Sequence, residues 1–102
     1  MNITIIGAGA YALSLALRFN KNKNKIIICS FVKEEIDVLN KTKMNEKALK
    51  NVKMPSNFIY TCDIKKALEG SNIVVLAVAT KYLSSVCEKI KPYIKDKHIV
   101  IA

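Results

Sequence analysis

Short apolar runs alternate with longer amphipathic stretches along the whole chain. The apolar runs are bounded by turn-forming or polar residues and predict buried strands at residues 3–6, 26–29, 58–61, 72–79 and 98–102. The fourth run contains the sequence IVVLAVA, whose length and β-branched residues are typical of a central strand that is buried on both faces.

Helical periodicity occupies the segments between these strands. The pattern predicts helices at residues 10–19, 33–40, 64–69 and 80–91. Asp63 is expected to cap the third helix and Gly70 to end it, while Thr80 caps the fourth and Pro92 ends it. The pattern at residues 44–54 is ambiguous and fits a short helix followed by a loop.

Strands that alternate with helices indicate the α/β fold class. Five short strands, each separated from the next by a helix, predict an open parallel sheet with helices on both faces. Right-handed crossovers then give the strand order 3-2-1-4-5. Because the chain has 102 residues, which is the length of one domain, we expect a single folded unit.

The chain is strongly basic, with a net charge of +9 from 17 basic and 8 acidic residues. Arg18 is the only arginine, and the lysines are scattered along the sequence. Proteins that read nucleic acids rely on arginine and on aromatic stacking. We therefore interpret the charge as a solvated surface and expect no specific nucleic-acid partner.

Cysteine and histidine are too few and too widely spaced for a disulfide framework or a metal site. Cys29, Cys62 and Cys87 are odd in number and form no C-x-x-C pair, and His98 is the only histidine. We expect three buried thiols, a cytoplasmic protein and no bound metal. Residues 3–17 are weakly hydrophobic but too short for a membrane span, so none is expected.

A glycine motif joins the first predicted strand to the first predicted helix, with the sequence Gly7-Ala8-Gly9-Ala10-Tyr11-Ala12. It matches the pattern G-x-G-x-x-G/A. Gly7 makes the tight turn, Gly9 lets a pyrophosphate approach the backbone, and Ala12 lets the helix lie close to the sheet. The helix N-terminus adds free N–H groups and a partial positive charge. In this context the motif predicts a Rossmann-type site for a dinucleotide.

The end of the second strand lacks the residue that usually reads the adenosine ribose. An acidic residue there binds the 2′-hydroxyl of NAD, and an arginine binds the 2′-phosphate of NADP. This chain has Phe31 and Lys33 instead, and its nearest acids are Glu34 and Glu35. Phe31 either stacks on the adenine or covers the edge of the sheet, and the pattern leaves both roles open.

A second candidate surface follows the fourth strand. Ligands of open α/β sheets bind beyond the carboxyl ends of the strands, at the switch point of the strand order. Val78, Ala79 and Thr80 are therefore expected to lie along the cofactor. Lys81 either reaches a phosphate or points into solvent, and Tyr82 either contacts the cofactor or packs on the protein.

With these segments in place, the chain resembles the N-terminal domain of NAD(P)-dependent glycerol-3-phosphate dehydrogenase. The resemblance covers the whole chain and depends on several motifs in a fixed order. These are the glycine motif with an aromatic residue at its fifth position, the pair Asn40 and Asn45, the segment Met54-Pro55-Ser56-Asn57-Phe58, the group Thr61, Asp63, Ala67 and Leu68, and the turn Ala77-Val78-Ala79-Thr80.

The resemblance implies a cofactor and a reaction. It assigns Ala10, Tyr11 and Phe31 to NAD or NADP, and NAD is slightly favoured because many bacterial members have a basic residue where Phe31 stands. Ala79 replaces a proline of the family. The implied reaction is hydride transfer between NAD(P)H and dihydroxyacetone phosphate, which gives sn-glycerol 3-phosphate.

The resemblance carries over no catalytic residue, because the family's catalytic lysine would follow directly after the fifth strand. We therefore expect residues 1–102 to be the cofactor-binding fragment of an enzyme that lacks its C-terminal substrate domain here. The fragment should bind cofactor without catalysis. The full-length enzyme is expected to be a cytoplasmic homodimer that acts on a small phosphorylated substrate.

Three alternatives stay open. A related reductase such as ketopantoate reductase begins with a similar glycine motif, although the spacings of Asn40, Asn45 and Pro55 favour the first interpretation. A nucleotide-sensing domain without catalysis would generally keep the acid that this second strand lacks. A protein that binds anionic polymers by charge alone would show salt-sensitive binding that ignores sequence.

Overall fold

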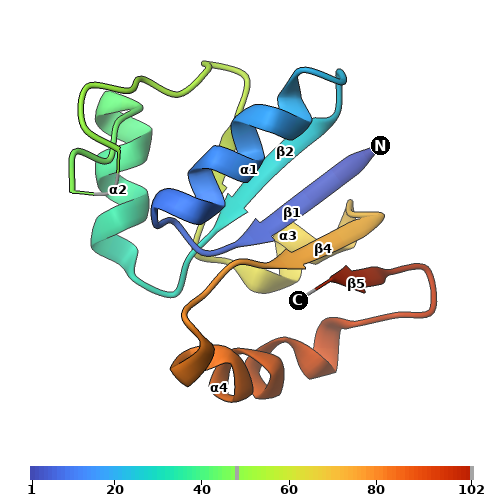
Figure 1. Cartoon of the computed structure of the whole chain (residues 1–102). Coiled ribbons are helices and arrows are strands. Elements are labelled where there is room, and N and C mark those ends of the chain that lie inside the picture. The colour runs from blue at the N-terminus through green and yellow to red at the C-terminus, as the bar shows by residue number, and fades with distance from the viewer. Residues whose placement is uncertain (48, 102) are drawn as a thin grey trace.

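The computed structural model describes residues 1–47 and 49–101 and contains a wholly parallel, five-stranded sheet (Figure 1). The strands are β1 (Asn2–Ile6), β2 (Lys25–Cys29), β3 (Ile59–Thr61), β4 (Ile73–Leu76) and β5 (Ile99–Ile101). Their order is β3-β2-β1-β4-β5, so the predicted α/β fold and strand order are confirmed. The fifth predicted strand included Ala102, which lies outside the described residues.

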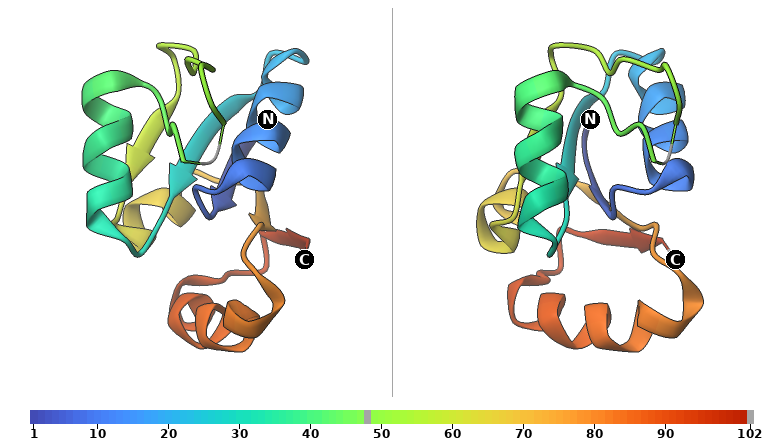
Figure 2. Two further views of the ribbon diagram at one scale, coloured as in Figure 1. Left: turned by 60° about the vertical axis from the view of Figure 1, so that its left-hand side comes forward. Right: turned by 90° about the vertical axis from the view of Figure 1, so that its left-hand side faces the viewer.

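Helices cover both faces of the sheet. They are α1 (Ala10–Asn20), α2 (Lys33–Thr42), α3 (Ile64–Glu69) and α4 (Thr80–Ile90), and the 3-10 helix η1 (Lys91–Tyr93) follows α4. The helices α1 and α2 lie on one face of the sheet, and α3 and α4 lie on the other (Figure 2). Buried side chains of each pair join a separate hydrophobic core. This is the two-sided layering that the alternation of strands and helices predicts.

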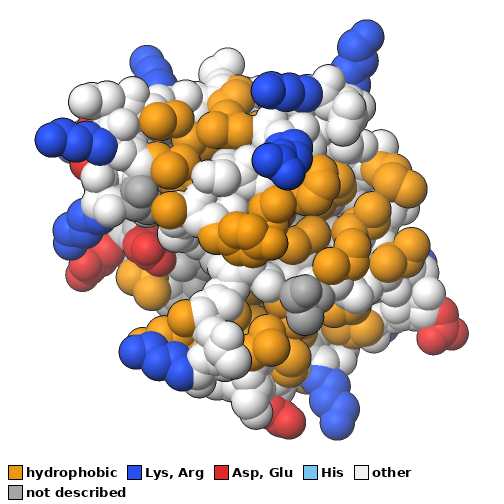
Figure 3. Space-filling view, viewed as in Figure 1, with side chains coloured by type: hydrophobic (Ala, Val, Ile, Leu, Met, Phe, Trp, Pro, Cys, Tyr) orange, Lys and Arg blue, Asp and Glu red, His pale blue; other side chains and the backbone are white. Residues whose placement is uncertain are grey.

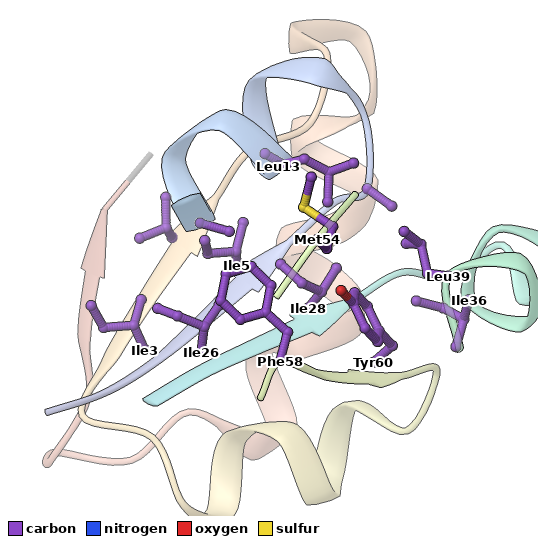
Figure 4. Close-up of a cluster of buried hydrophobic side chains, with 14 residues drawn as sticks. Ile3, Ile5, Leu13, Ile26, Ile28, Ile36, Leu39, Met54, Phe58 and Tyr60 are labelled. Carbon is purple, nitrogen blue, oxygen red and sulfur yellow. The ribbon is translucent and has the colours of Figure 1, made fainter. Parts of the chain in front are cut away.

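Alternation along the strands explains the two layers. Ile26 and Ile28 of β2 pack under α1 and α2, whereas Ile27 and Cys29 face the opposite cluster. The side chains of a strand point to opposite faces in turn, so each inner strand contributes apolar groups to both cores. Figure 4 shows the first core, in which strand residues meet Leu13 of α1.

The β5 edge of the sheet is apolar and open. All three side chains of this strand are exposed. Figure 3, drawn from the side of Figure 1, shows hydrophobic side chains gathered beside α1, over the part of the sheet that this helix leaves uncovered. Among the residues described here, no helix is both long and apolar enough to cross a membrane.

Several local predictions are wrong. The fourth strand ends at Leu76 instead of residue 79, because the neighbouring β1 ends at Ile6 and offers no further partner. Thr80 is the first residue of α4, and Ala79 occupies the cap position. Of the cysteines, only Cys29 is buried, whereas Cys62 is half-buried and Cys87 is exposed.

Asp63 caps α3 as predicted, since its side chain accepts a hydrogen bond of 3.2 Å from the backbone N–H of Lys66. The ambiguous segment 44–54 forms a loop without helix in its described part, and Met44 and Lys53 pair in an isolated antiparallel bridge. Ala48 of this loop lies outside the described residues.

Candidate cofactor-binding site

Gly7 occupies a turn that only glycine fits. Its φ is +130°, a backbone conformation that residues other than glycine rarely adopt. A Cβ at this position would lie 3.1 Å from the carbonyl carbon of Ala77 and closer still to its oxygen. The N–H of Gly7 donates to the carbonyl of Cys29 at 2.7 Å. Gly7 is therefore where β1, β2 and the residue after β4 converge.

Gly9 differs from Gly7 because none of the described residues crowds it. A Cβ added at Gly9 would meet no heavy atom of residues 1–47 and 49–101 within 4 Å, and its φ of −80° suits any residue. The Gly9 carbonyl accepts from the N–H of Leu13 at 3.0 Å and so starts α1. Its own N–H makes no hydrogen bond with the described residues. The space beside Gly9 is free for a ligand that approaches the backbone.

The N-terminus of α1 carries an uncompensated positive end. The first turn contains no acidic residue, and no side chain caps it. The N–H groups of the first turn have no partner within the helix, and the helix dipole adds partial positive charge there. Ala8 and Ala12 are buried, whereas Ala10 and Tyr11 are exposed, with Tyr11 open over 68% of its surface. This end of α1 is chemically suited to an anion.

A groove of about 1080 Å³ begins at this helix end and runs between the glycine turn and α2. Apolar side chains and the loop after α2 form most of its wall. It is lined by Gly9, Ala10, Val32, Glu34, Glu35, Val38, Thr42, Met44, Asn45, Glu46 and Lys47. A groove of this size is typical of a site for a small molecule or cofactor.

The groove is acidic although the protein is basic. Glu34, Glu35 and Glu46 line it, and Lys47 is its one basic lining residue among those described. Glu35 also accepts a hydrogen bond from the Ser30 hydroxyl at 3.0 Å, which fixes the turn between β2 and α2. Sequence reasoning noted Glu34 and Glu35 as the nearest acids but did not place them in the site. It missed Val32 and Val38, which carry no motif.

Phe31 lies beside the groove without lining it. Phe31 is 36% exposed, and the Lys89 ammonium of α4 lies 4.7 Å from the centroid of its ring. The next residue, Val32, does line the groove. The ring thus lies next to Val32 at the margin of the groove, and its stacking on adenine stays a prediction.

The residues after β4 reach the same edge of the sheet on the other side of the turn. Val78 is half-buried and packs against the cluster under α3 and α4, whereas Ala79 and Thr80 are exposed. Tyr82 is 54% exposed, and the Lys81 ammonium lies 5.1 Å from its ring centroid. None of these residues lines the groove, but the contact between Gly7 and Ala77 places them next to the glycine turn.

Cys29 is a buried thiol at the end of β2, on this edge of the sheet. Burial raises the pKa of its thiol from 9.0 to about 12, with smaller contributions from Cys62 and Asp63. The thiol is therefore neutral near pH 7 and serves packing at the end of β2. Among the described residues, no group of three or more acidic, histidine or cysteine side chains gathers as a metal site would require.

Comparison with known proteins identifies the family. A family model described as NAD-dependent glycerol-3-phosphate dehydrogenase N-terminus matches residues 2–102. The glycerol-3-phosphate dehydrogenase (NAD(P)+) of Fusobacterium nucleatum is 34% identical over 101 residues, which cover 99% of this chain and 30% of that protein. The protein of the same name from Geobacillus thermodenitrificans is 37% identical over 88 residues, which cover 86% of this chain and 26% of that protein.

Two solved structures have the same fold as this chain. Glycerol-3-phosphate dehydrogenase from Coxiella burnetii has a TM-score of 0.90 at 27% identity, covering 97% of this chain and 30% of that one. The enzyme from Plasmodium falciparum, with a TM-score of 0.81 at 24% identity over 100% of this chain and 32% of that one, supports the fold alone. The chain thus spans about 30% of the length of its first curated relatives. It belongs to the NAD-dependent glycerol-3-phosphate dehydrogenase N-terminus family.

Proposed function

We propose that residues 1–102 form the NAD(P)-binding domain of a glycerol-3-phosphate dehydrogenase. The bound cofactor supplies the hydride that the whole enzyme transfers between NAD(P)H and dihydroxyacetone phosphate, with sn-glycerol 3-phosphate as the reduced product. The residues of this chain hold and orient the cofactor. The observation that carries the proposal is the open space at Gly9, where the fold itself does not require glycine.

The pyrophosphate lies on the turn Gly7–Ala12 in this proposal. The uncapped first turn of α1 supports it, because that turn has no acidic residue to compete with a phosphate. The exposed Ala10 and Tyr11 flank the anion, and the buried Ala8 and Ala12 hold the turn against the sheet.

The adenosine half lies toward the groove, against the apolar residues Phe31 and Val32. Glu34 is exposed in the first turn of α2 and lines the groove, so its carboxylate is available to accept from a ribose hydroxyl. The carboxylates of Glu34 and Glu35, which both line the groove, repel a 2′-phosphate. This charge favours NAD over NADP as the cofactor.

The nicotinamide half runs along Val78, Ala79 and Thr80, with Tyr82 beside it. The N-terminus of α4, like that of α1, has no capping side chain and no acid in its first turn. The helices α1 and α4 follow β1 and β4, which end side by side at Ile6 and Leu76. Both helix N-termini therefore flank the switch point of the strand order, where ligands of open α/β sheets bind.

The rest of the enzyme is part of the proposal. We assign the catalytic groups and the site for the phosphorylated substrate to sequence that the longer relatives carry and this chain does not span. The full-length enzyme is proposed to be a homodimer, on the resemblance alone. A cytoplasmic location is supported by the three cysteines, which are all free thiols.

A titration of the 102-residue chain with NADH and, separately, NADPH tests the proposal. Nicotinamide fluorescence should show saturable binding of both cofactors, with NADH bound at least about fivefold more tightly, because a like-charge contact of a few ångströms costs on the order of 1 kcal/mol or more. Replacing Gly9 by valine should abolish binding, since its side chain would fill the space for the pyrophosphate.

Matched charge variants locate the selectivity. Glu34→Gln should narrow the preference for NADH, whereas Glu88→Gln, the same charge change on the exposed surface of α4, should leave it unchanged. Absence of saturable binding of either cofactor to the folded chain would overturn the proposed function.

A further inference from the structure

The loop after α2, residues 43–54, forms one wall of the groove and is held firmly at its base. Its first residue, Lys43, accepts a hydrogen bond of 2.6 Å from the N–H of Met54. Met44 and Lys53 pair in the antiparallel bridge, and Met54 is 2% exposed within the first core. These contacts hold the base of the loop without using the Asn45 side chain.

One side chain of this loop reaches the glycine turn. The Asn45 amide nitrogen Nδ2 donates to the carbonyl of Ala8 at 2.8 Å, across 37 positions of sequence. The backbone of Asn45 is fixed in turn, because its carbonyl accepts from the N–H of Leu49 at 2.8 Å. Asn45 thus connects the groove wall to the peptide between Ala8 and Gly9.

The geometry of a peptide bond gives this contact a consequence. The carbonyl of Ala8 and the N–H of Gly9 belong to one planar trans unit, so they point in opposite directions. This unit turns about ψ of Ala8 and φ of Gly9, and the missing side chain at Gly9 makes that rotation easier in the absence of a restraint. A hydrogen bond that holds the carbonyl toward the loop therefore fixes the direction of the Gly9 N–H.

We propose that Asn45 is a positioning residue for the cofactor. It holds the Ala8 carbonyl so that the Gly9 N–H stays free to donate to the pyrophosphate. This inference rests on the proposed function, because it requires a phosphate at the glycine turn. The Gly9 N–H makes no hydrogen bond with the described residues of the protein, as this role requires.

The test compares ligands with and without the diphosphate. Asn45→Ala should weaken binding of NADH and of ADP about tenfold, the effect of losing one well-placed hydrogen bond. Its affinity for adenosine should stay within about twofold of the wild type, since adenosine lacks the group that Gly9 contacts. Asn57→Ala removes an exposed amide that donates to Asn20 at 3.1 Å and serves as the matched control, with unchanged affinity for all three ligands.

A second variant and the pattern of failure keep the test decisive. Asn45→Leu keeps the branched shape of the side chain and adds no charge, but it cannot donate, so it should also weaken ADP selectively if Asn45→Ala does not fold. If the Asn45 variant binds ADP and adenosine equally more weakly, or binds both as tightly as the wild type does, the inference is overturned. Binding of NADH by the wild type would still support the proposed function in that case. Failure of the wild type to bind NADH would overturn both.

Discussion

The three glycines of the chain should respond differently to the same substitution, and Gly7 is the critical one. Gly7→Ala places a Cβ against the backbone of Ala77 at a φ of +130°. That backbone is not free to move away, because the N–H of Ala77 donates to the carbonyl of Ile6 at 2.9 Å. Steric overlap and an unfavourable backbone conformation therefore act together.

The structure sets the size of the effect. A residue held in a sparsely populated conformation costs about 1–3 kcal/mol, and overpacking a dense site costs about 1–3 kcal/mol. Gly7→Ala should thus lower the free energy of unfolding by about 2–6 kcal/mol out of a total of about 5–15 kcal/mol. At about 4–8 °C per kcal/mol, the melting temperature should fall by about 10 °C or more.

Urea unfolding followed by circular dichroism measures the change, with the other two glycines as controls. Gly70→Ala lies at a φ of −95° in open space, so it should be neutral or stabilise by up to about 1 kcal/mol. Gly9→Ala should cost less than about 1 kcal/mol as a change of cap residue, yet weaken binding of NADH. A Gly7→Ala variant as stable as Gly70→Ala would refute the reasoning.

Three other predictions follow from the core and the turn after β4. Tyr60→Phe should raise the free energy of unfolding by about 1 kcal/mol, because the buried phenol oxygen has no hydrogen-bond partner among the described residues. A lower free energy of unfolding, measured in urea, would contradict this. Ala79→Pro should raise stability by about 0.4–1 kcal/mol, since Ala79 has a φ of −59° and donates no hydrogen bond within the described structure; a lower melting temperature would count against it. Cys29 ionises only near pH 12 in the folded chain but from pH 9.0 when exposed, so its contribution to stability is full below pH 9.0 and falls as the pH rises toward 12, by up to about 1.4 kcal/mol per pH unit. Urea midpoints across this range should decline less steeply in Cys29→Ala, and equal slopes would disprove the assignment.

Local patterns were enough to predict the layers and strand order. Alternation places Ile27 and Ile28 in opposite cores without knowledge of any partner strand. The strand order follows because crossover connections between parallel strands are right-handed. The end of β4 was different. The apolar run continues to residue 79, but a strand stops where its neighbour stops, and that is a property of the pairing with β1.

The site divides in the same way. The glycine motif is contiguous, so its turn and helix could be read directly from residues 7–12. The groove joins that turn to α2 and to a loop without periodicity, and Asn45 reaches Ala8 only because the chain folds back across 37 positions. The exposure of Cys87 was accessible in principle, because Val86 and Ile90 mark the buried face of α4.

Nitrogen-15 chemical shifts of the 102-residue chain, titrated with NAD, test the central claim most directly. The account predicts saturable shifts at the backbone amides of Gly7, Gly9 and Ala10 and along the groove at Val32 and Glu34. Amides of residues 21–24, in the turn at the opposite end of the sheet, should stay unmoved. Shifts concentrated on residues 21–24, shifts spread over the exposed lysines, or no shifts at all would contradict the claim that this glycine turn and groove bind the cofactor.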